Sequence, residues 1–302
     1  MNLIERAATR IAGAPPGSLL ERAEAQGMFA TLATSRGLPP QGQAIAPEPA
    51  PVRPATGASA PRMAFDRARL AAAGYVLPEG PHDRLAEEMR IIRQRLAAHG
   101  ASPPGSVMVT SARPGEGKTF FALNLALGAA RDEGRPIVLV DGDLRRQGLS
   151  RALGLGESPG IQAALAGEAD LDACLLRVDD LPLMILPAGR IDPAAEPPTE
   201  PQIRGLVERI AAGMPDCLVV YDAPPMLAAT EPILLAPHVD RVLFVVEADR
   251  TPERAVASAL DLLSSTEHVS MVLNKAPARR GGDTFGGYDY APTGSAGRTV
   301  RS

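Results

Sequence analysis

The chain has 302 residues, of which 45% are hydrophobic and only 3% aromatic, and it carries a formal net charge of −4. This length allows one or two domains, and the shortage of aromatic residues favours a buried parallel sheet over an aromatic-rich sandwich. The charge gives no general attraction to nucleic acid or to an anionic membrane, and the two cysteines, Cys174 and Cys217, lack the spacing of a disulfide framework or a zinc site.

The first 74 residues have few signals of a packed domain. Residues 1–13 have the apolar spacing of a short amphipathic helix, which is either a fraying terminus or a docking helix for a partner or membrane surface. Seven prolines between residues 37 and 61 predict an extended linker. With no signal peptide and no apolar run of about 18 residues, we expect a cytoplasmic chain whose residues 1–74 are mostly disordered.

Residues 75–277 are predicted to form the folded domain. Apolar periodicity predicts a helix over 83–98 and alternation of further strands and helices. This alternation predicts an α/β fold with a mostly parallel sheet flanked by helices on both faces, and a ligand at the carboxyl ends of the strands. The expected strands are 106–110, 136–141, 183–187, 217–222, 241–247 and 270–274, and the further helices are 118–131, 200–213 and 252–265.

A phosphate-binding loop follows the first of these strands. The spacing is that of a Walker A motif in which alanine replaces the first glycine, so the fold class is that of a P-loop NTPase. Gly115 and Gly117 allow a turn whose N–H groups converge on an anion, Lys118 reaches the β and γ phosphates, and the hydroxyl of Thr119 is expected on Mg²⁺. The predicted ATP-binding residues are Ala112, Arg113, Pro114, Gly115, Glu116, Gly117, Lys118 and Thr119.

Two further strands end in acidic residues. The first delivers Asp141, Asp143 and Arg145 beside the phosphate loop, although Asp-Gly is also a common turn signal. The second ends at Asp222 before two prolines and is of the Walker B type, with a carboxylate that holds Mg²⁺ directly or through a water. The predicted metal-site residues are therefore Thr119, Asp141 and Asp222.

The last strand ends in Asn274 and Lys275. The amide of Asn274 is either a hydrogen-bonding partner for the adenine edge of ATP or a turn residue. Lys118 and Lys275 are the only lysines among many arginines, which either reflects codon bias or agrees with a need for a compact cation at the phosphates.

These motifs in this order, A-x-x-x-x-G-K-T, V-D-G-D-L-R and V-V-Y-D-A-P-P, resemble the cytoplasmic domains of bacterial tyrosine autokinases, in the stand-alone form associated with exosortase-linked polysaccharide loci. The resemblance covers residues 75–276. It implies that Lys118 and Thr119 bind phosphate and Mg²⁺, that Asp141, Asp143 and Arg145 serve catalysis, and that the activity regulates exopolysaccharide biosynthesis and export. It also implies a membrane partner of the polysaccharide co-polymerase type, which would recruit the chain to the inner membrane.

Two other segments extend the resemblance. Glu87, Arg90 and Arg93 are similar to the motif by which these kinases assemble into rings, although the same spacing also occurs on solvated helix faces. The Gly-rich tail of residues 278–302 is expected to be flexible and carries Tyr288 and Tyr290 as candidate phosphoacceptors in trans. The tyrosine cluster is shorter than in many members of the family.

Two alternatives remain open from the sequence. One is a switch ATPase of the partition or division-site type, which places a lysine where this chain has Arg113. The other is a nucleotide-binding regulator of a polysaccharide machine with little transferase activity.

Overall fold

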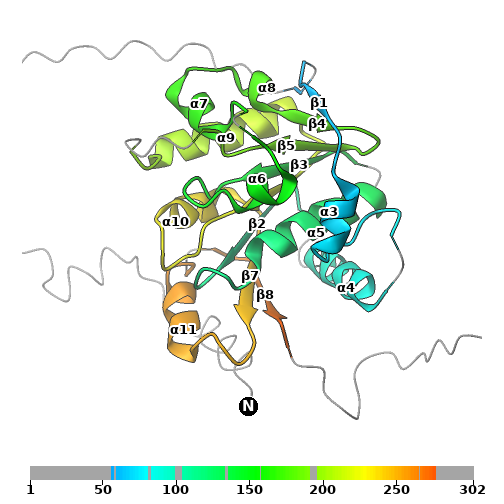
Figure 1. Cartoon of the computed structure of the whole chain (residues 1–302). Coiled ribbons are helices and arrows are strands. Elements are labelled where there is room, and N and C mark those ends of the chain that lie inside the picture. Colours follow the sequence, from blue (N-terminus) through cyan, green and yellow to red (C-terminus); the bar gives the residue numbers. More distant parts are fainter. Residues whose placement is uncertain are drawn as a thin grey trace, which may run out of the picture.

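The computed structural model describes residues 56–57, 59–80, 83–98, 104–132, 135–156, 158–190, 196–264 and 266–276. Within these residues, eight strands form one sheet in the order β1-β4-β5-β3-β6-β2-β7-β8. Every neighbouring pair in it is parallel except β4 and β5. This is the mostly parallel α/β sheet that the sequence predicts (Figure 1).

The strands are β1 (Arg62–Met63), β2 (Ser106–Ser111), β3 (Ile137–Asp141), β4 (Leu176–Val178), β5 (Leu183–Leu186), β6 (Leu218–Asp222), β7 (Arg241–Glu247) and β8 (Val269–Asn274). The helices are α3 (Arg67–Ala72), α4 (Arg84–Ala98), α5 (Lys118–Asp132), α6 (Gly148–Leu153), α7 (Ile161–Ala166), α8 (Leu171–Cys174), α9 (Glu200–Gly213), α10 (Glu231–Leu235), the 3-10 helix η1 (Ala236–His238) and α11 (Glu253–Asp261).

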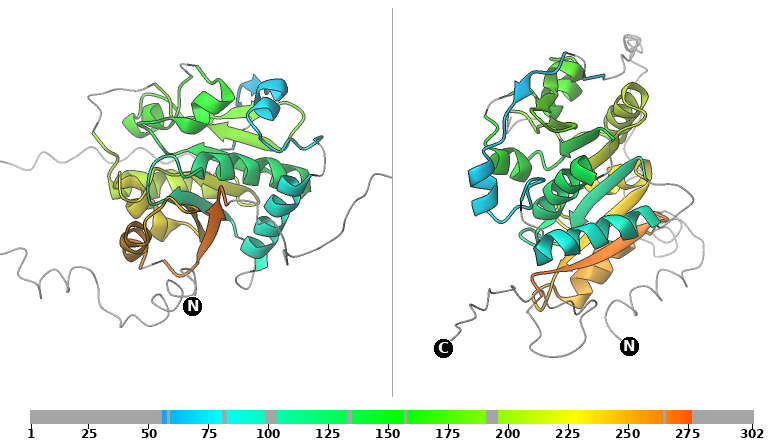
Figure 2. Two further views of the ribbon diagram at one scale, coloured as in Figure 1. Left: turned by 60° about the horizontal axis from the view of Figure 1, so that its bottom comes forward. Right: turned by 90° about the vertical axis from the view of Figure 1, so that its right-hand side faces the viewer.

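Helices cover both faces of the sheet (Figure 2). Two hydrophobic cores lie between these helices and the sheet. One core joins the sheet to α3, α4, α5 and α6, and the other joins it to α7, α8, α9, α10 and α11. Because both faces are covered, the central strands β3 and β6 are buried at every position, which explains their continuous apolar sequences.

Alternation along the central strands decides which side chains meet α5. Leu139 faces the core that contains α5, whereas Val140 faces the opposite core. Because strand side chains alternate between faces, Asp141 points to the same side as Leu139, and Asp222 to the same side as Val220. Both carboxylates therefore lie on the face of the sheet that α5 covers.

The sequence predicts that the folded domain begins at residue 75. In the structure, packed elements already occur before this residue. β1 pairs with β4 in parallel, and Leu70 of α3 is buried in the core beside α5. Tyr75 stacks on Phe120 at 5.4 Å between ring centroids. β1 and α3 are too short to give a clear apolar period in the sequence. Their place in the domain is therefore evident only from these tertiary contacts. Residues 1–55 and 277–302 lie outside the described residues.

In the part of the chain described here, no helix has both the length and the apolar character that a membrane span requires.

Candidate phosphate-binding site

The phosphate loop joins the end of β2 to the start of α5. Gly115 and Gly117 adopt φ values of 88° and 104°, a region that other residues rarely adopt. Gly117 is also closely packed, since an added Cβ would lie 2.1 Å from Nδ2 of Asn274. The sequence therefore uses glycine where both the backbone angle and the available space require it.

Lys118 is the first residue of α5 and is only 7% exposed. Its Nζ lies 2.9 Å from Oδ2 of Asp143 and 3.4 Å from Oδ1 of Asp222. Burial opposes the charged form, but attraction to the two carboxylates outweighs burial and raises the pKa of Lys118 above its ordinary value. The site thus holds a charged ammonium group at the amino end of a helix, where an anion is also favoured.

Asp141 and Asp222 occupy the same register position on the neighbouring strands β3 and β6, and both have 0% exposure. Oδ2 of Asp141 accepts hydrogen bonds from the backbone N–H and the hydroxyl of Ser150, at 2.8 and 2.7 Å. Burial and the charge of Asp222 nevertheless raise the pKa of Asp141 to about 7. Burial also raises the pKa of Asp222, against the opposing attraction of Lys118.

The donor set fits an Mg²⁺ ion that is shared with a nucleotide. Among the described residues, Oδ1 of Asp141 and Oδ2 of Asp222 are buried and have no hydrogen-bond partner. The described residues contain no cluster of three or more His, Cys, Asp or Glu side chains that could hold a metal ion by themselves. Mg²⁺ commonly takes one or two carboxylates and completes its shell with phosphates and waters. The side chain of Thr119 lies close enough to Asp222 to lower the pKa of that carboxyl, so its hydroxyl is a further oxygen at the same place.

The other side of the loop is held by residues whose contacts the sequence does not predict. Glu116 is 3% exposed, and its carboxylate accepts hydrogen bonds from the N–H of Arg113 at 2.8 Å and from the Thr251 hydroxyl at 2.5 Å. Asn274 donates from Nδ2 to the Glu116 carbonyl at 2.8 Å. Lys275 donates from Nζ to the Gly115 carbonyl at 2.9 Å. Lys275 was not predicted as a site residue, and the rarity of lysine in this chain is the one sequence signal that could have found it.

Several predicted site residues are exposed rather than buried in this cluster. Arg145 is exposed in the turn after β3, whereas the buried Asp143 of the same motif contacts Lys118. Arg113 and Pro114 are exposed at the tip of the loop. Tyr288 and Tyr290 lie outside the described residues.

The predicted ring motif lies on α4, away from the loop. Arg90 pairs with Glu87 on the same helix, and both side chains are about half exposed. Arg93 instead forms an ion pair with Asp132 of α5 and has a side chain that is 9% exposed. The guanidinium of Arg93 also packs on Gly128, where an added Cβ would lie 2.0 Å from its Nη1. Arg93 therefore joins two helices of one chain.

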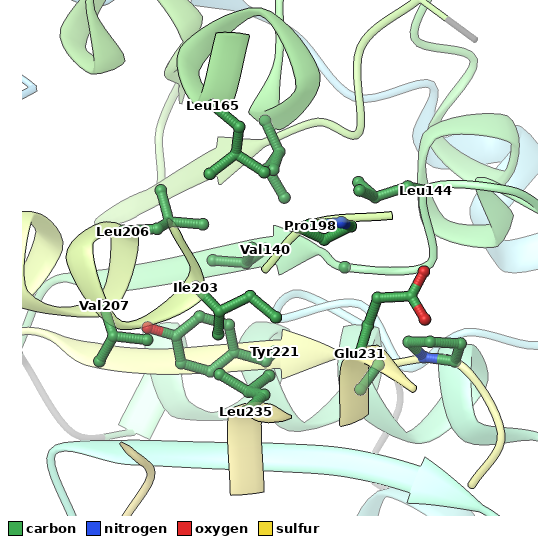
Figure 3. Close-up of a pocket in the computed structure, with 14 residues that line it drawn as sticks. Val140, Leu144, Leu165, Pro198, Ile203, Leu206, Val207, Tyr221, Glu231 and Leu235 are labelled. Atoms are coloured by element: carbon green, nitrogen blue, oxygen red, sulfur yellow. The ribbon is translucent and has the colours of Figure 1, made fainter. Parts of the chain in front are cut away.

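An apolar pocket lies behind the two acidic strands (Figure 3). Val140 and Tyr221 line it, and these residues face the core opposite α5. Its walls are hydrocarbon apart from a few groups such as the Glu231 carboxylate, and the lining contains no lysine or arginine. This composition does not suit phosphate, so the candidate nucleotide site is the loop on the other face.

Comparisons with known proteins agree with this geometry. The tyrosine-protein kinase YwqD of Bacillus subtilis (strain 168) is 29% identical over 187 residues, which are 61% of this chain and 78% of YwqD. The succinoglycan biosynthesis transport protein ExoP of Rhizobium meliloti (strain 1021) is 31% identical over 214 residues, which are 66% of this chain but 26% of ExoP. The chain thus spans about a quarter of ExoP.

A solved structure of a kinase domain is also similar to this chain. The VpsO kinase domain is 29% identical and superposes with a TM-score of 0.53, over 63% of this chain and 92% of that domain. No family model matches the chain.

Proposed function

We propose that this chain, which is related to the bacterial tyrosine-protein kinases in sequence and fold, transfers the γ-phosphoryl group of MgATP to a tyrosine hydroxyl. The observation that carries this proposal is the position of Lys118. It lies at the end of a Gly-rich loop, between Asp143 and Asp222, on the face of the sheet where both acidic strands end. A phosphate-binding lysine, a metal-binding carboxylate and a further carboxylate are the groups that phosphoryl transfer requires.

The proposed reaction rests on positioning and charge. The N–H groups of residues 115–118 and the ammonium group of Lys118 bind the β and γ phosphates. Asp141, Asp222 and Thr119 would hold Mg²⁺, which neutralises charge on the phosphates when bound. These groups fix the γ phosphorus in line with the attacking oxygen, and such positioning accounts for much of the catalysis in phosphoryl transfer.

The acceptor step needs a group that takes the phenol proton. As the tyrosine oxygen bonds to the γ phosphorus, the bond from that phosphorus to the β-phosphate oxygen breaks and ADP leaves. The phenol proton passes to Asp143, the carboxylate of the first acidic motif that is not assigned to the metal. Asp143 is 2% exposed and lies beside the phosphate-binding Lys118, which positions it to accept the proton of an oxygen that attacks the γ phosphate.

We further propose that the acceptors are Tyr288 and Tyr290 and that transfer occurs in trans within a ring of identical chains. The name of ExoP, a succinoglycan biosynthesis transport protein, supports a role in exopolysaccharide biosynthesis and export. In that role the chain would act on the cytoplasmic side of the inner membrane, with a membrane partner of the co-polymerase type.

The direct test is incubation of the purified chain with MgATP, followed by mass spectrometry of the tail, with the Lys118→Met variant as the comparison. Phosphate on Tyr288 or Tyr290 that is absent in the variant would support the kinase. Phosphate release without modified tyrosine would instead indicate a switch ATPase.

A further inference from the structure

We propose that Asn274 and Lys275 are positioning residues that hold the phosphate loop in its anion-binding form by capturing two of its carbonyl groups. This inference rests on the proposed nucleotide site and extends it to the end of β8. The captured carbonyls are those of Glu116 and Gly115, at 2.8 Å from Nδ2 of Asn274 and 2.9 Å from Nζ of Lys275.

The reason for such capture lies in the peptide units of the loop. A loop binds an anion when successive N–H groups point toward it, and this orientation turns carbonyl oxygens away from it. Carbonyl oxygens that faced the phosphates would repel them. An ammonium group and an amide on the outer side of the loop attract the oxygens of Gly115 and Glu116, and so favour the orientation with the N–H groups inward.

Neighbouring residues hold the two capturing groups in place. Nζ of Lys275 lies 3.3 Å from Oε2 of Glu247 at the end of β7, whose side chain is 12% exposed. The backbone N–H of Lys275 donates to Oδ1 of Asn274 at 2.8 Å. Lys275 has a φ of 55°, an uncommon value for a residue other than glycine, asparagine or aspartate. The local structure thus maintains a costly backbone conformation that aims this lysine at the loop.

A second connection joins the loop to the turn after β7. The carboxylate of Glu116 accepts the hydroxyl of Thr251, and Oγ1 of Thr251 in turn accepts the backbone N–H of Glu247 at 3.1 Å. Glu247 therefore contacts both Lys275 and Thr251, which bind the loop at adjacent positions. These residues form one continuous support on the side of the loop opposite Asp143 and Asp222.

The test measures binding of Mg²⁺ complexes of ADP and of inorganic pyrophosphate, using displacement of a fluorescent ADP analogue from the full chain. Removal of one charge-assisted hydrogen bond by Lys275→Met should weaken both ligands about tenfold. Asn274→Ala should also weaken both. Lys275→Arg, which keeps a cationic donor, should recover part of the affinity, and a role of the hydrocarbon part of the side chain alone would not predict this recovery.

The matched control is Arg250→Met. Arg250 also pairs with Glu247, at 3.6 Å, but its side chain is 79% exposed. This variant should bind both ligands within twofold of the unchanged chain. Unaltered binding by Lys275→Met, or an equal loss in Arg250→Met, would overturn the proposal.

Pyrophosphate separates the two roles considered for Asn274, since it has no base. If Asn274→Ala weakened ADP alone, the amide would act on adenine and its assignment to the loop would be wrong. Because the readout is binding, a chain that binds ADP without phosphorylating tyrosine would contradict the proposed function but leave this inference standing.

Discussion

Asp141 and Asp222 are register partners on the parallel strands β3 and β6, so the fold delivers two buried carboxylates to one point. The two strands begin and end at paired positions, and each strand ends at its aspartate. The arrangement concentrates negative charge beside Lys118. The single charge of Lys118 does not balance these carboxylates, so the arrangement is unfavourable without a further cation. This suits a site that binds Mg²⁺ with its nucleotide.

Replacing Asp141 by Asn should therefore stabilise the metal-free protein and abolish phosphoryl transfer. Because the pKa of Asp141 in the folded chain is raised to about 7, its ionisation costs folding free energy. Relative to the variant, the unchanged protein should lose stability as the pH rises from about 4 to 7, by about 1–3 kcal/mol. Urea unfolding in EDTA at pH 5 and pH 8 measures this difference.

The control for that experiment is Asp179→Asn, at an exposed carboxylate that pairs with Arg62. Its effect on the free energy of unfolding should stay within about 0.5 kcal/mol at both pH values. If the Asp141→Asn chain were less stable than the unchanged protein at pH 8, ionised Asp141 would not destabilise the fold, and the prediction would be wrong.

Replacing Lys118 by Met should lower stability as well as activity. The variant leaves Asp143 and Asp222 without their cation in a buried site, at a cost of about 2–4 kcal/mol. Phosphoryl transfer should fall at least about a hundredfold. Thermal unfolding and tail phosphorylation are the measurements, and Arg62→Met, which removes an exposed cation, should change neither.

Replacing Gly117 by Ala should weaken both folding and nucleotide binding. The φ of 104° is unsuitable for alanine, and the new Cβ would collide with the Asn274 amide. We expect a loss of about 1–3 kcal/mol in the free energy of unfolding. Gly205→Ala is the matched control, because no atom lies within 4 Å of the added Cβ and alanine favours a helix such as α9. If the two variants were equally stable, the close contact at Gly117 would not matter.

The two arginines of the ring motif make different contacts, so their replacement should have different effects. Arg90→Ala should lower the oligomer mass in light scattering without changing thermal stability, since Arg90 pairs only with the exposed Glu87 among the contacts described for it. Arg93→Ala should lower the midpoint of thermal unfolding by several degrees, because it breaks the link between α4 and α5. An unchanged mass for Arg90→Ala would remove Arg90 from the interface.

The long elements were predictable because their burial has a simple period. The strands β2, β3 and β6, with their apolar centres, and the long α5 and α9 were each predicted to within about one residue. The short helices α6, α7, α8 and α10 were missed, since four to six residues are too few to establish a helical period. β4 was missed for the same reason, and with it the antiparallel pair that it forms with β5.

The resemblance to bacterial tyrosine autokinases, stated from three motifs, is confirmed by the comparisons. The sequence also placed Lys118, Asp141, Asp143 and Asp222 near one another, because the carboxyl ends of parallel strands share one edge. Contacts such as Ser150 with Asp141 were not predictable in this way. They depend on how a short helix packs after a turn, which no motif records.

The location of the only two lysines has a practical consequence for chemical labelling. Lys118 and Lys275 both contact the phosphate loop or its partners, so every lysine amine in the chain reports on this site. Lys275 is half exposed and should react first with an amine-directed reagent, whereas the buried Lys118 should react slowly. Peptide mapping of the modified lysines, with and without a bound nucleotide, would then give a footprint of the site in unaltered protein.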